Sequence, residues 1–357
     1  MPRLTIDGQA VEVRDGATVL DAARTLGIAI PALCHRPDFA PSTSCMVCVV
    51  RIDGAPRLVP SCATAAAEGM EVESETPAVR AARRTSLELL ASDHTGDCVA
   101  PCQRADDHHA DLPRFLRQVA AGDVDGAAAT LAAAGIPLDD PDTIDLTPAE
   151  KACRRGRADE PVTLGRLARW VAERRRYVSG AAPPPASPYR AFASRIAKLS
   201  PAELAELLAG AAPGGAVAPD ASGRDLSAAA AAGEAARCVH CDCRRAQSCL
   251  LHEACAAYAV LPGRFSGPRP PLAIDRSHPE ILFEPGKCIR CGLCLQAAER
   301  AGEELGLAFA GRGFAMRVTT PFGAPLAAAL RTSATTCADV CPTGAFVRRG
   351  PAPVVQP

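Results

Sequence analysis

The distribution of cysteines constrains this chain more than any other feature. Its 357 residues include 17 cysteines but only 9 Phe, 3 Tyr and 1 Trp. The cysteines fall into four groups, at residues 34–62, 98–153, 238–255 and 288–341. Many cysteines with few aromatic residues indicate small modules that depend on bound metal more than on large hydrophobic cores. The length allows two or three such modules.

Disulfides are the competing interpretation of so many cysteines. The N-terminus "MPRLTIDGQAVEV" has no charged start followed by an apolar stretch, so it does not resemble a secretory signal. We therefore expect a cytoplasmic protein, in which cysteine clusters are more often metal sites than disulfides. No apolar run approaches the length that a membrane span needs.

The charge pattern indicates neither a nucleic-acid surface nor a membrane surface. The formal net charge is −1 at pH 7. The dense basic stretches "CRRGR" at 153–157 and "RRRY" at 174–177 lie on an expected helix with acidic residues nearby. We predict that both form a solvated helix face and that the protein has no nucleic-acid partner.

The first 77 residues have the pattern of a compact β-rich domain. "RLTIDG" and "VEVRDG" are alternating strands joined by a turn at Asp7-Gly8. "ATVLDAARTLGI" has apolar residues at helical spacing, and Gly27 ends the helix. "CVVRIDGAPRLVPSC" predicts strand, turn and strand, and "EGMEVESE" predicts a last strand. Two hairpins and a crossing helix suit a β-grasp arrangement, and residues 78–92 predict a following helix.

The first cysteine group has the spacing C-x10-C-x2-C-x13-C, at Cys34, Cys45, Cys48 and Cys62. Four thiolates can hold either zinc or two irons with bridging sulfides. A zinc ribbon usually has two C-x2-C pairs, whereas this group has one pair and two single cysteines around a long loop. Small residues in that loop let backbone N–H groups approach the sulfurs. We therefore predict a [2Fe–2S] cluster.

The fourth group combines two incomplete ferredoxin-type runs. The first run has Cys288, Cys291 and Cys294, with Ala298 where a fourth cysteine would stand; the second run ends in Cys337 and Cys341-Pro342. In two-cluster ferredoxins the fourth cysteine of each run binds the other run's cluster. This rule completes one [4Fe–4S] site and leaves the other with a single ligand. The ligands of the complete site are Cys288, Cys291, Cys294 and Cys341.

The third group packs four cysteines, C-x2-C-x-C-x5-C, into 12 residues: Cys238, Cys241, Cys243 and Cys249. A disulfide framework this tight would be strained. Zinc and [4Fe–4S] both accept four thiolates, and the neighbouring cluster motifs favour iron and sulfur. Cys255 and His252 lie behind the motif at helical spacing, and we expect both to fill a core.

These motifs resemble a known family. The first group, on its strand pattern, resembles the ferredoxin domain that begins the large iron–sulfur subunit of respiratory complex I and of NAD-linked hydrogenases and formate dehydrogenases. Three close cysteines followed by a distant Cys-Pro-x-Gly resemble a later module of the same subunit. Ser44 and Met46 depart from the family, which usually has Gly and Arg beside the second and third ligands.

The second group is weaker and resembles two modules. His94-x3-Cys98 followed by Cys102 resembles the complex I module in which an imidazole and three thiolates bind a [4Fe–4S] cluster. "ACRRG…PV" resembles the helical domain of glutamate synthase small-subunit proteins, with Cys153 on a ligand position. One cluster at His94, Cys98 and Cys102 would take His108 or Cys153 as its fourth ligand. The alternative is a domain that kept its helices and lost its metal.

The predicted fold class is α+β, with an N-terminal β-grasp [2Fe–2S] ferredoxin domain, a helical middle segment and a small C-terminal ferredoxin-like [4Fe–4S] module. Ser200, Pro201 and Glu203 predict a short capped helix within the linker. The predicted segments are 1–77 (β-grasp), 78–117 (His/Cys-type), 118–178 (helical, glutamate-synthase-like), 179–225 (linker) and 226–350 (cysteine-rich module).

The predicted function is electron transfer. No dinucleotide-binding G-x-G-x-x-G follows a strand, and no Walker loop or catalytic triad is found. The resemblance implies a non-catalytic subunit that relays electrons between a flavin- or NAD(P)H-binding partner and a second redox subunit or ferredoxin. The alternative function is an iron–sulfur redox- or iron-sensing regulatory protein.

Overall fold

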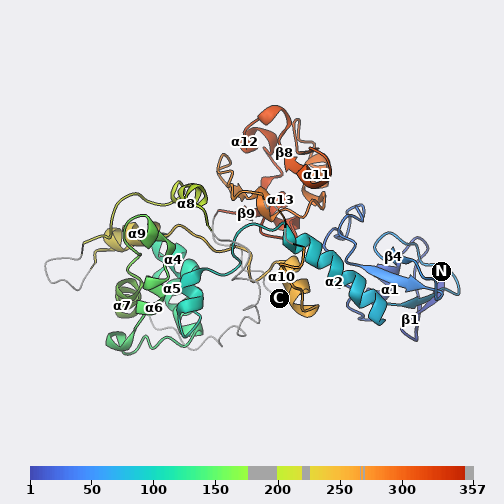
Figure 1. The fold of residues 1–357 in the computed structure, drawn as a ribbon, viewed down its shortest axis with the longest axis horizontal. Helices are drawn as coiled ribbons and strands as arrows, with labels where there is room; N and C mark the ends of the chain where they lie inside the picture. Colours follow the sequence, from blue (N-terminus) through green and yellow to red (C-terminus); the bar gives the residue numbers. More distant parts are fainter. Residues whose placement is uncertain (176–198, 219–225, 266, 268–269, 350–357) are drawn as a thin grey trace. The chain divides into compact units, whose positions relative to one another are not determined.

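The protein's computed structural model describes residues 1–175, 199–218, 226–265, 267 and 270–349. It divides into two compact units, Met1–Thr95 with Arg244–Pro357, and Gly96–Cys243 (Figure 1). The mixture of helices and strands agrees with the predicted α+β class, whereas the finer division into five segments stays a prediction. Within the predicted linker, residues 179–198 and 219–225 lie outside the described residues.

The N-terminal sheet has the two predicted hairpins. Strands β1 and β2 pair antiparallel, as do β3 and β4, and β5 lies between the hairpins, parallel to β1 and antiparallel to β3. The strand order is β2-β1-β5-β3-β4. The strands are β1 Arg3–Ile6, β2 Gln9–Glu12, β3 Val49–Ile52, β4 Leu58–Pro60 and β5 Glu71–Glu73.

One helix covers this sheet because its sequence is capped at the start and apolar on one side. Helix α1, Val19–Thr25, begins at Thr18, whose hydroxyl accepts from the Asp21 N–H while the Asp21 carboxylate accepts from the Thr18 N–H. The buried residues of α1 share a core with Leu4 and Ile6 of β1.

Helix α2, Pro77–Ser92, leaves the sheet and is held by a fully buried arginine. The Arg83 guanidinium donates to the Val49 carbonyl from Nε at 3.0 Å and from Nη2 at 2.9 Å. It also donates to the Tyr258 hydroxyl at 2.8 Å, at the end of helix α10, Leu250–Ala257. Arg83 thus joins the N-terminal sheet to the C-terminal part of the same unit.

The C-terminal part of the first unit is built from short elements. Strand β6 pairs antiparallel with β9, and the rings of Phe283 and Phe346 stack at 4.3 Å between centroids. Helices α11 and α13 pack against each other, and β7 pairs with β8. The elements are β6 Ile281–Phe283, η3 Pro285–Lys287, α11 Leu293–Arg300, β7 Ala308–Ala310, η4 Gly313–Ala315, β8 Arg317–Thr319, η5 Pro321–Gly323, α12 Leu326–Ala329, α13 Ala334–Val340 and β9 Phe346–Arg348.

Small buried side chains occupy three of the four positions that a second ferredoxin cluster would use, and the exposed Arg331 stands at the fourth. Ala298, Ala334 and Cys337 are 1%, 2% and 0% exposed and pack in one core with Leu326 and Leu330. This part of the structure is therefore held by apolar packing.

A carboxylate anchors the turn that enters α13. Glu303 accepts from the backbone N–H groups of Arg331, Thr332 and Ser333 at 3.0, 2.7 and 2.7 Å. Burial opposes ionisation, but the hydrogen bonds from Thr332 and Ser333 hold the pKa of Glu303 at about 2. Glu303 therefore stays ionised at neutral pH and fixes the turn.

We expect Glu303→Gln to lower the free energy of unfolding of this region by about 1–3 kcal/mol at pH 7, because a charged acceptor is lost. A lowered folded-state pKa stabilises the fold above the unfolded pKa of Glu, and this contribution is lost as pH falls towards about 2. The difference between variant and wild type should therefore shrink at pH 3. Hydrogen exchange of the 331–340 amides at pH 7 and pH 3 measures this difference in stability. Glu304→Gln, at an exposed neighbouring carboxylate, is the matched control. Equal protection in both variants would contradict the assignment.

The second unit is helical. Its helices α4, α5, α7 and α9 share one core, and the Trp170 indole N–H donates to the Leu226 carbonyl at 2.7 Å (Figure 1). The predicted capping box of Ser200 and Glu203 is confirmed at α8. The elements are α3 Pro101–Ala105, α4 Leu112–Ala120, α5 Val124–Ala133, η1 Pro141–Thr143, α6 Thr147–Lys151, η2 Arg154–Arg157, α7 Leu164–Arg174, α8 Pro201–Leu208 and α9 Ala228–Ala236.

The predicted solvated face at "CRRGR" is wrong. Arg155 is 2% exposed because its guanidinium donates to the Asp159 carboxylate and to the carbonyls of Ala212 and Gly214. Arg154 is largely buried and pairs with Asp97. Of "RRRY", residues 176–177 lie outside the described part of the chain. No helix in the described residues is both long enough and apolar enough to cross a bilayer.

Candidate metal centres

Four cysteines predicted to bind [2Fe–2S] lie together at one end of the β3–β4 hairpin. Cys48 directly precedes β3, and Cys62 follows β4 by two residues; because Val49 pairs with Pro60, both cysteines are at the same end. Cys34 and Cys45 approach from the loop that precedes β3, and all four are buried.

The sulfurs are close enough to hydrogen-bond with one another. Cys34 bonds with Cys45 and Cys62, and these bonds lower the pKa of Cys34 and raise that of Cys45 and Cys62. The bond with Cys62 lowers the pKa of Cys48 to about 6. Because the thiolate is the form that binds metal, this grouping suits a shared metal centre.

Backbone N–H groups also point at these sulfurs. The N–H of Cys45 donates to Cys34, that of Val47 to Cys45, and that of Cys62 to Cys48, and each bond lowers the acceptor's pKa. Hydrogen bonds to ligand sulfurs help set the reduction potential of an iron–sulfur cluster. Four buried thiols with N–H donors fit a [2Fe–2S] cluster.

A pocket in the C-terminal part of the first unit is lined by all four cysteines predicted to bind [4Fe–4S], namely Cys288, Cys291, Cys294 and Cys341. Two precede α11, one lies in its first turn, and Cys341 directly follows α13. Burial raises the pKa of Cys288 to about 11 and raises that of Cys291 and Cys294 as well. Bound irons would supply the positive charge that thiolates at this depth need. The donor set therefore fits a cluster.

Cys337 lies outside this donor set. Its Sγ–H donates to the Cys294 carbonyl at 3.4 Å, and the side chain is 0% exposed within the apolar core. Cys337 is not among the residues that line the pocket. The two cysteines of "CADVC" therefore lie in different environments: Cys341 lines the pocket, and Cys337 packs in the apolar core.

A loop connects the two candidate centres. The Ser42 hydroxyl donates to the Cys291 carbonyl at 2.5 Å and lies 3.3 Å from the Cys34 carbonyl. The Ala40 N–H donates to Gln296 Oε1 at 2.9 Å, and Gln296 Nε2 donates to the Ala40 carbonyl at 3.0 Å. The sequence indicated Ser42 only as a small loop residue, because its partner is about 250 residues away along the chain.

The predicted ligands His94, Cys98 and Cys102 fall in different units. His94 belongs to the first unit, where burial, followed by the charges of Lys287 and His252, lowers its pKa to about 3. Cys98 and Cys102 belong to the second unit, in which His108 is exposed. This ligand set therefore stays a prediction.

The predicted set at 238–249 also spans both units. Cys238, Cys241 and Cys243 belong to the second unit and Cys249 to the first. Cys255 and His252 are buried on α10, as expected for core residues. Among the described residues, no three His, Cys or acidic side chains surround one point as a single metal ion would require. Each thiolate of a cubane binds a different iron, so cluster ligands need not meet that condition.

A family comparison agrees with the N-terminal centre. Residues 2–77 match the family described as "2Fe-2S iron-sulfur cluster binding domain". This part of the chain is a [2Fe–2S] domain. The match supports the predicted [2Fe–2S] cofactor, whereas the number of [4Fe–4S] clusters stays a prediction.

Relatives of this chain confirm the predicted resemblance. A subunit of the NADH-quinone oxidoreductase of Rhizobium meliloti is 46% identical over 98 residues, which are 28% of this chain and 12% of that protein. The HndD subunit of the NADP-reducing hydrogenase of Solidesulfovibrio fructosivorans is 48% identical over 104 residues, 28% of this chain and 18% of that protein. The alignments thus cover less than a fifth of these relatives. The resemblance of the helical segment to glutamate synthase stays a prediction.

A solved structure resembles the whole chain in fold. A chain of an NAD+-reducing [NiFe]-hydrogenase in the H2-reduced state aligns with a TM-score of 0.54, over 100% of this chain and 90% of that chain. The two sequences are 21% identical, so the similarity concerns the fold alone.

Proposed function

We propose that this protein is a non-catalytic iron–sulfur subunit that passes single electrons between two redox partners. The observation that carries the proposal is the Ser42 loop, which contacts Cys34 of one candidate centre and Cys291 of the other. Iron–sulfur clusters supply one-electron chemistry, and two in contact through one loop can exchange electrons. We assign Cys34, Cys45, Cys48 and Cys62 to a [2Fe–2S] cluster and Cys288, Cys291, Cys294 and Cys341 to a [4Fe–4S] cluster.

The chain's own residues would hold and tune these centres. The thiolates would bind the irons. The N–H groups of Cys45, Val47 and Cys62 would stabilise negative charge on the sulfurs. Phe346 and Pro342 make the C-terminal pocket apolar and limit the access of water. Both effects act on reduction potential, which depends on hydrogen bonding and solvent exposure.

The partners are inferred from the relatives. Their names describe subunits of an NADH-quinone oxidoreductase, an NADP-reducing hydrogenase and an NADPH-Fe(3+) oxidoreductase. All three activities involve a nicotinamide. We therefore propose a flavin- or NAD(P)H-binding subunit on one side and a second redox subunit or a ferredoxin on the other, within the cytoplasm.

Metal analysis of anaerobically purified protein tests this function. We expect at least about six irons per chain, the sum of one [2Fe–2S] and one [4Fe–4S] cluster, with matching sulfide. After addition of less than one equivalent of dithionite, rapid-freeze EPR should find the electron distributed between two clusters. A preparation that holds zinc alone, or clusters that do not exchange electrons, would overturn the proposal.

Ser42→Ala should lower the reduction potential of the [2Fe–2S] cluster. The Ser42 hydroxyl lowers the pKa of Cys34, although the bonds with Cys45 and Cys62 act more strongly. The hydroxyl proton is donated to the Cys291 carbonyl, so the hydroxyl acts on Cys34 as a nearby dipole. Its loss removes stabilisation of the reduced, more negative state, by at most about 20–60 mV, the equivalent of one hydrogen bond of 0.5–1.5 kcal/mol. Redox titration by EPR measures the shift, and Ser44→Ala in the same loop is the control. A potential that does not fall would contradict this role.

A further inference from the structure

Three separate segments of the helical unit bring four cysteines to its hydrophobic core. Cys102 lies on α3, which packs against α6, and Cys153 follows α6 by two residues. Cys238 and Cys241 follow α9 by two and five residues, and α9 packs against α4 and α7. Cys102 belongs to the unit's hydrophobic core, and the other three cysteines pack against that same core.

The Cys238–Cys241 turn has the geometry of a turn in the C-terminal centre. The His240 N–H donates to Cys238 Sγ at 3.4 Å, and His240 has a φ of 46°. The Arg290 N–H donates to Cys288 Sγ at 3.3 Å, and Arg290 has a φ of 58°. Residues other than Gly seldom adopt this left-handed backbone conformation. In both turns it aims a backbone N–H at the first sulfur.

A buried polar network ties the segment of Cys153 to that of Cys238. Arg155 Nη1 donates to the Arg237 carbonyl at 3.2 Å, so the second residue after Cys153 contacts the residue before Cys238. Asp159 accepts from both guanidinium groups.

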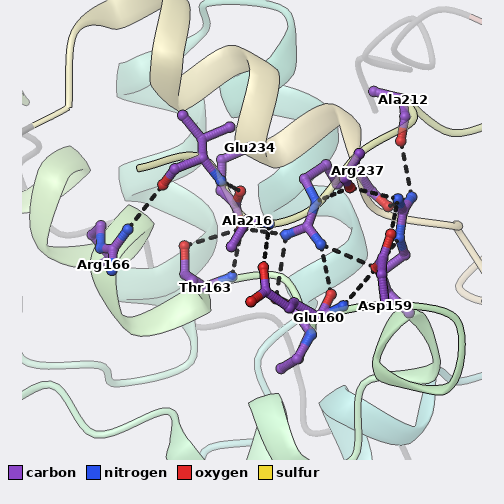
Figure 2. A network of polar contacts seen from close by, with 12 residues as sticks. Asp159, Glu160, Thr163, Arg166, Ala212, Ala216, Glu234 and Arg237 are labelled. Carbon is purple, nitrogen blue, oxygen red and sulfur yellow. Dashed lines mark hydrogen bonds and ion pairs between the residues drawn. The ribbon is translucent and has the colours of Figure 1, made fainter. Parts of the chain in front are cut away.

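Figure 2 shows how Arg237 is held: it pairs with Glu234 at 3.0 Å and with Asp159 at 3.2 Å, and it donates to the Glu160 carbonyl at 2.6 Å. The side chains of Arg237 and Glu234 are 1% and 0% exposed. The two cysteine-bearing segments are therefore fixed together by the fold itself.

The electrostatics of the four thiols agree with their proximity. Burial is the main cause that raises the pKa of Cys102, and the charges of Cys241, Cys238 and Cys153 raise it further. Cys102 is therefore close enough to Cys153, Cys238 and Cys241 for their charges to act on it.

We propose that Cys102, Cys153, Cys238 and Cys241 bind a further [4Fe–4S] cluster, one thiolate to each iron. The inference deepens the proposed electron-transfer function and rests on it. It differs from both ligand sets expected from sequence, because it joins Cys102 and Cys153 to the first two cysteines of the tight motif.

Iron analysis of cysteine variants tests the ligand set. Cys153→Ser and Cys241→Ser should each lose about four irons per chain relative to wild type. The double variant should lose the same four, because both residues serve one cluster. Buried Cys255→Ser, on α10 of the other unit, is the matched control and should keep all the iron. Signals from the clusters assigned to 34–62 and 288–341 should persist throughout, whereas failure of the proposed function would remove them from the wild type as well.

A measurement on wild-type protein covers the case in which a variant fails to fold. Treatment with an iron chelator should expose Cys102, Cys153, Cys238 and Cys241 to alkylation together, as read by mass spectrometry. Retention of all iron in Cys153→Ser, loss of about eight irons in the double variant, loss of one zinc instead of four irons, or alkylation of the four at unrelated rates would each overturn the proposal.

Discussion

Cys341→Ser should remove the [4Fe–4S] cluster, and Cys337→Ser should leave it in place. The two cysteines stand four residues apart, but only Cys341 lines the pocket together with Cys288, Cys291 and Cys294. Cys337 bonds to the Cys294 carbonyl from within the apolar core.

We expect loss of about four irons per chain and of the cubane EPR signal in the first variant, and neither in the second. Iron and sulfide analysis with EPR on anaerobic protein measures both. Because Cys337 is 0% exposed, its replacement tests whether mere disturbance of this region releases iron. Equal loss in both variants would contradict the crossed-ligand assignment.

Arg237→Met should destabilise the helical unit by about 3–5 kcal/mol, because removal of one partner leaves Glu234 buried without its cation. Arg237 is 1% exposed and makes contacts with Glu234, Asp159 and three backbone carbonyls (Figure 2). Methionine retains much of the apolar stem, so the loss is mainly electrostatic.

Fluorescence of Trp170 reports the unfolding of this unit in urea, since the chain has 1 Trp and it lies in the helical core. Arg166→Met is the matched control: Arg166 is half-buried and donates to the Val217 carbonyl at 3.1 Å. We expect the control to cost about 1 kcal/mol. If the two variants unfold at the same urea concentration, the buried network does not carry the stability assigned to it.

Local sequence was sufficient to predict the hairpins and the first helix of the N-terminal domain. Turn residues at Asp7-Gly8, a capped helix after Thr18 and alternating strands specify neighbouring elements, and the observed sheet has the predicted hairpins. The grouping of the four cysteines predicted to bind [2Fe–2S] was also predictable, because three of the four lie within the loop before β3 or at its end. When cysteines lie close together along the chain, their spacing strongly limits how far apart their sulfurs can be.

The sequence did not predict the burial of an arginine, because burial of a charge depends on partners that are distant along the chain. "CRRGR" was expected to be solvated, yet Arg155 is buried because Asp159 and the carbonyls of Ala212 and Gly214 satisfy its donors. The two carbonyls lie more than 50 residues further along the chain. An arginine with every donor satisfied can be buried, but the sequence does not reveal distant acceptors.

The sequence by itself determined the kind of chemistry: cysteine spacing indicated iron–sulfur ligation, and the crossing rule paired Cys341 with the run that begins at Cys288. Only the tertiary structure decided which distant groups meet. It brought Ser42 to Cys291, and it joined the segment of Cys153 to that of Cys238 through Arg155 and Arg237. The physical reason is that spacing limits ligands within one loop, whereas helix packing and buried hydrogen bonds decide which separate segments lie side by side.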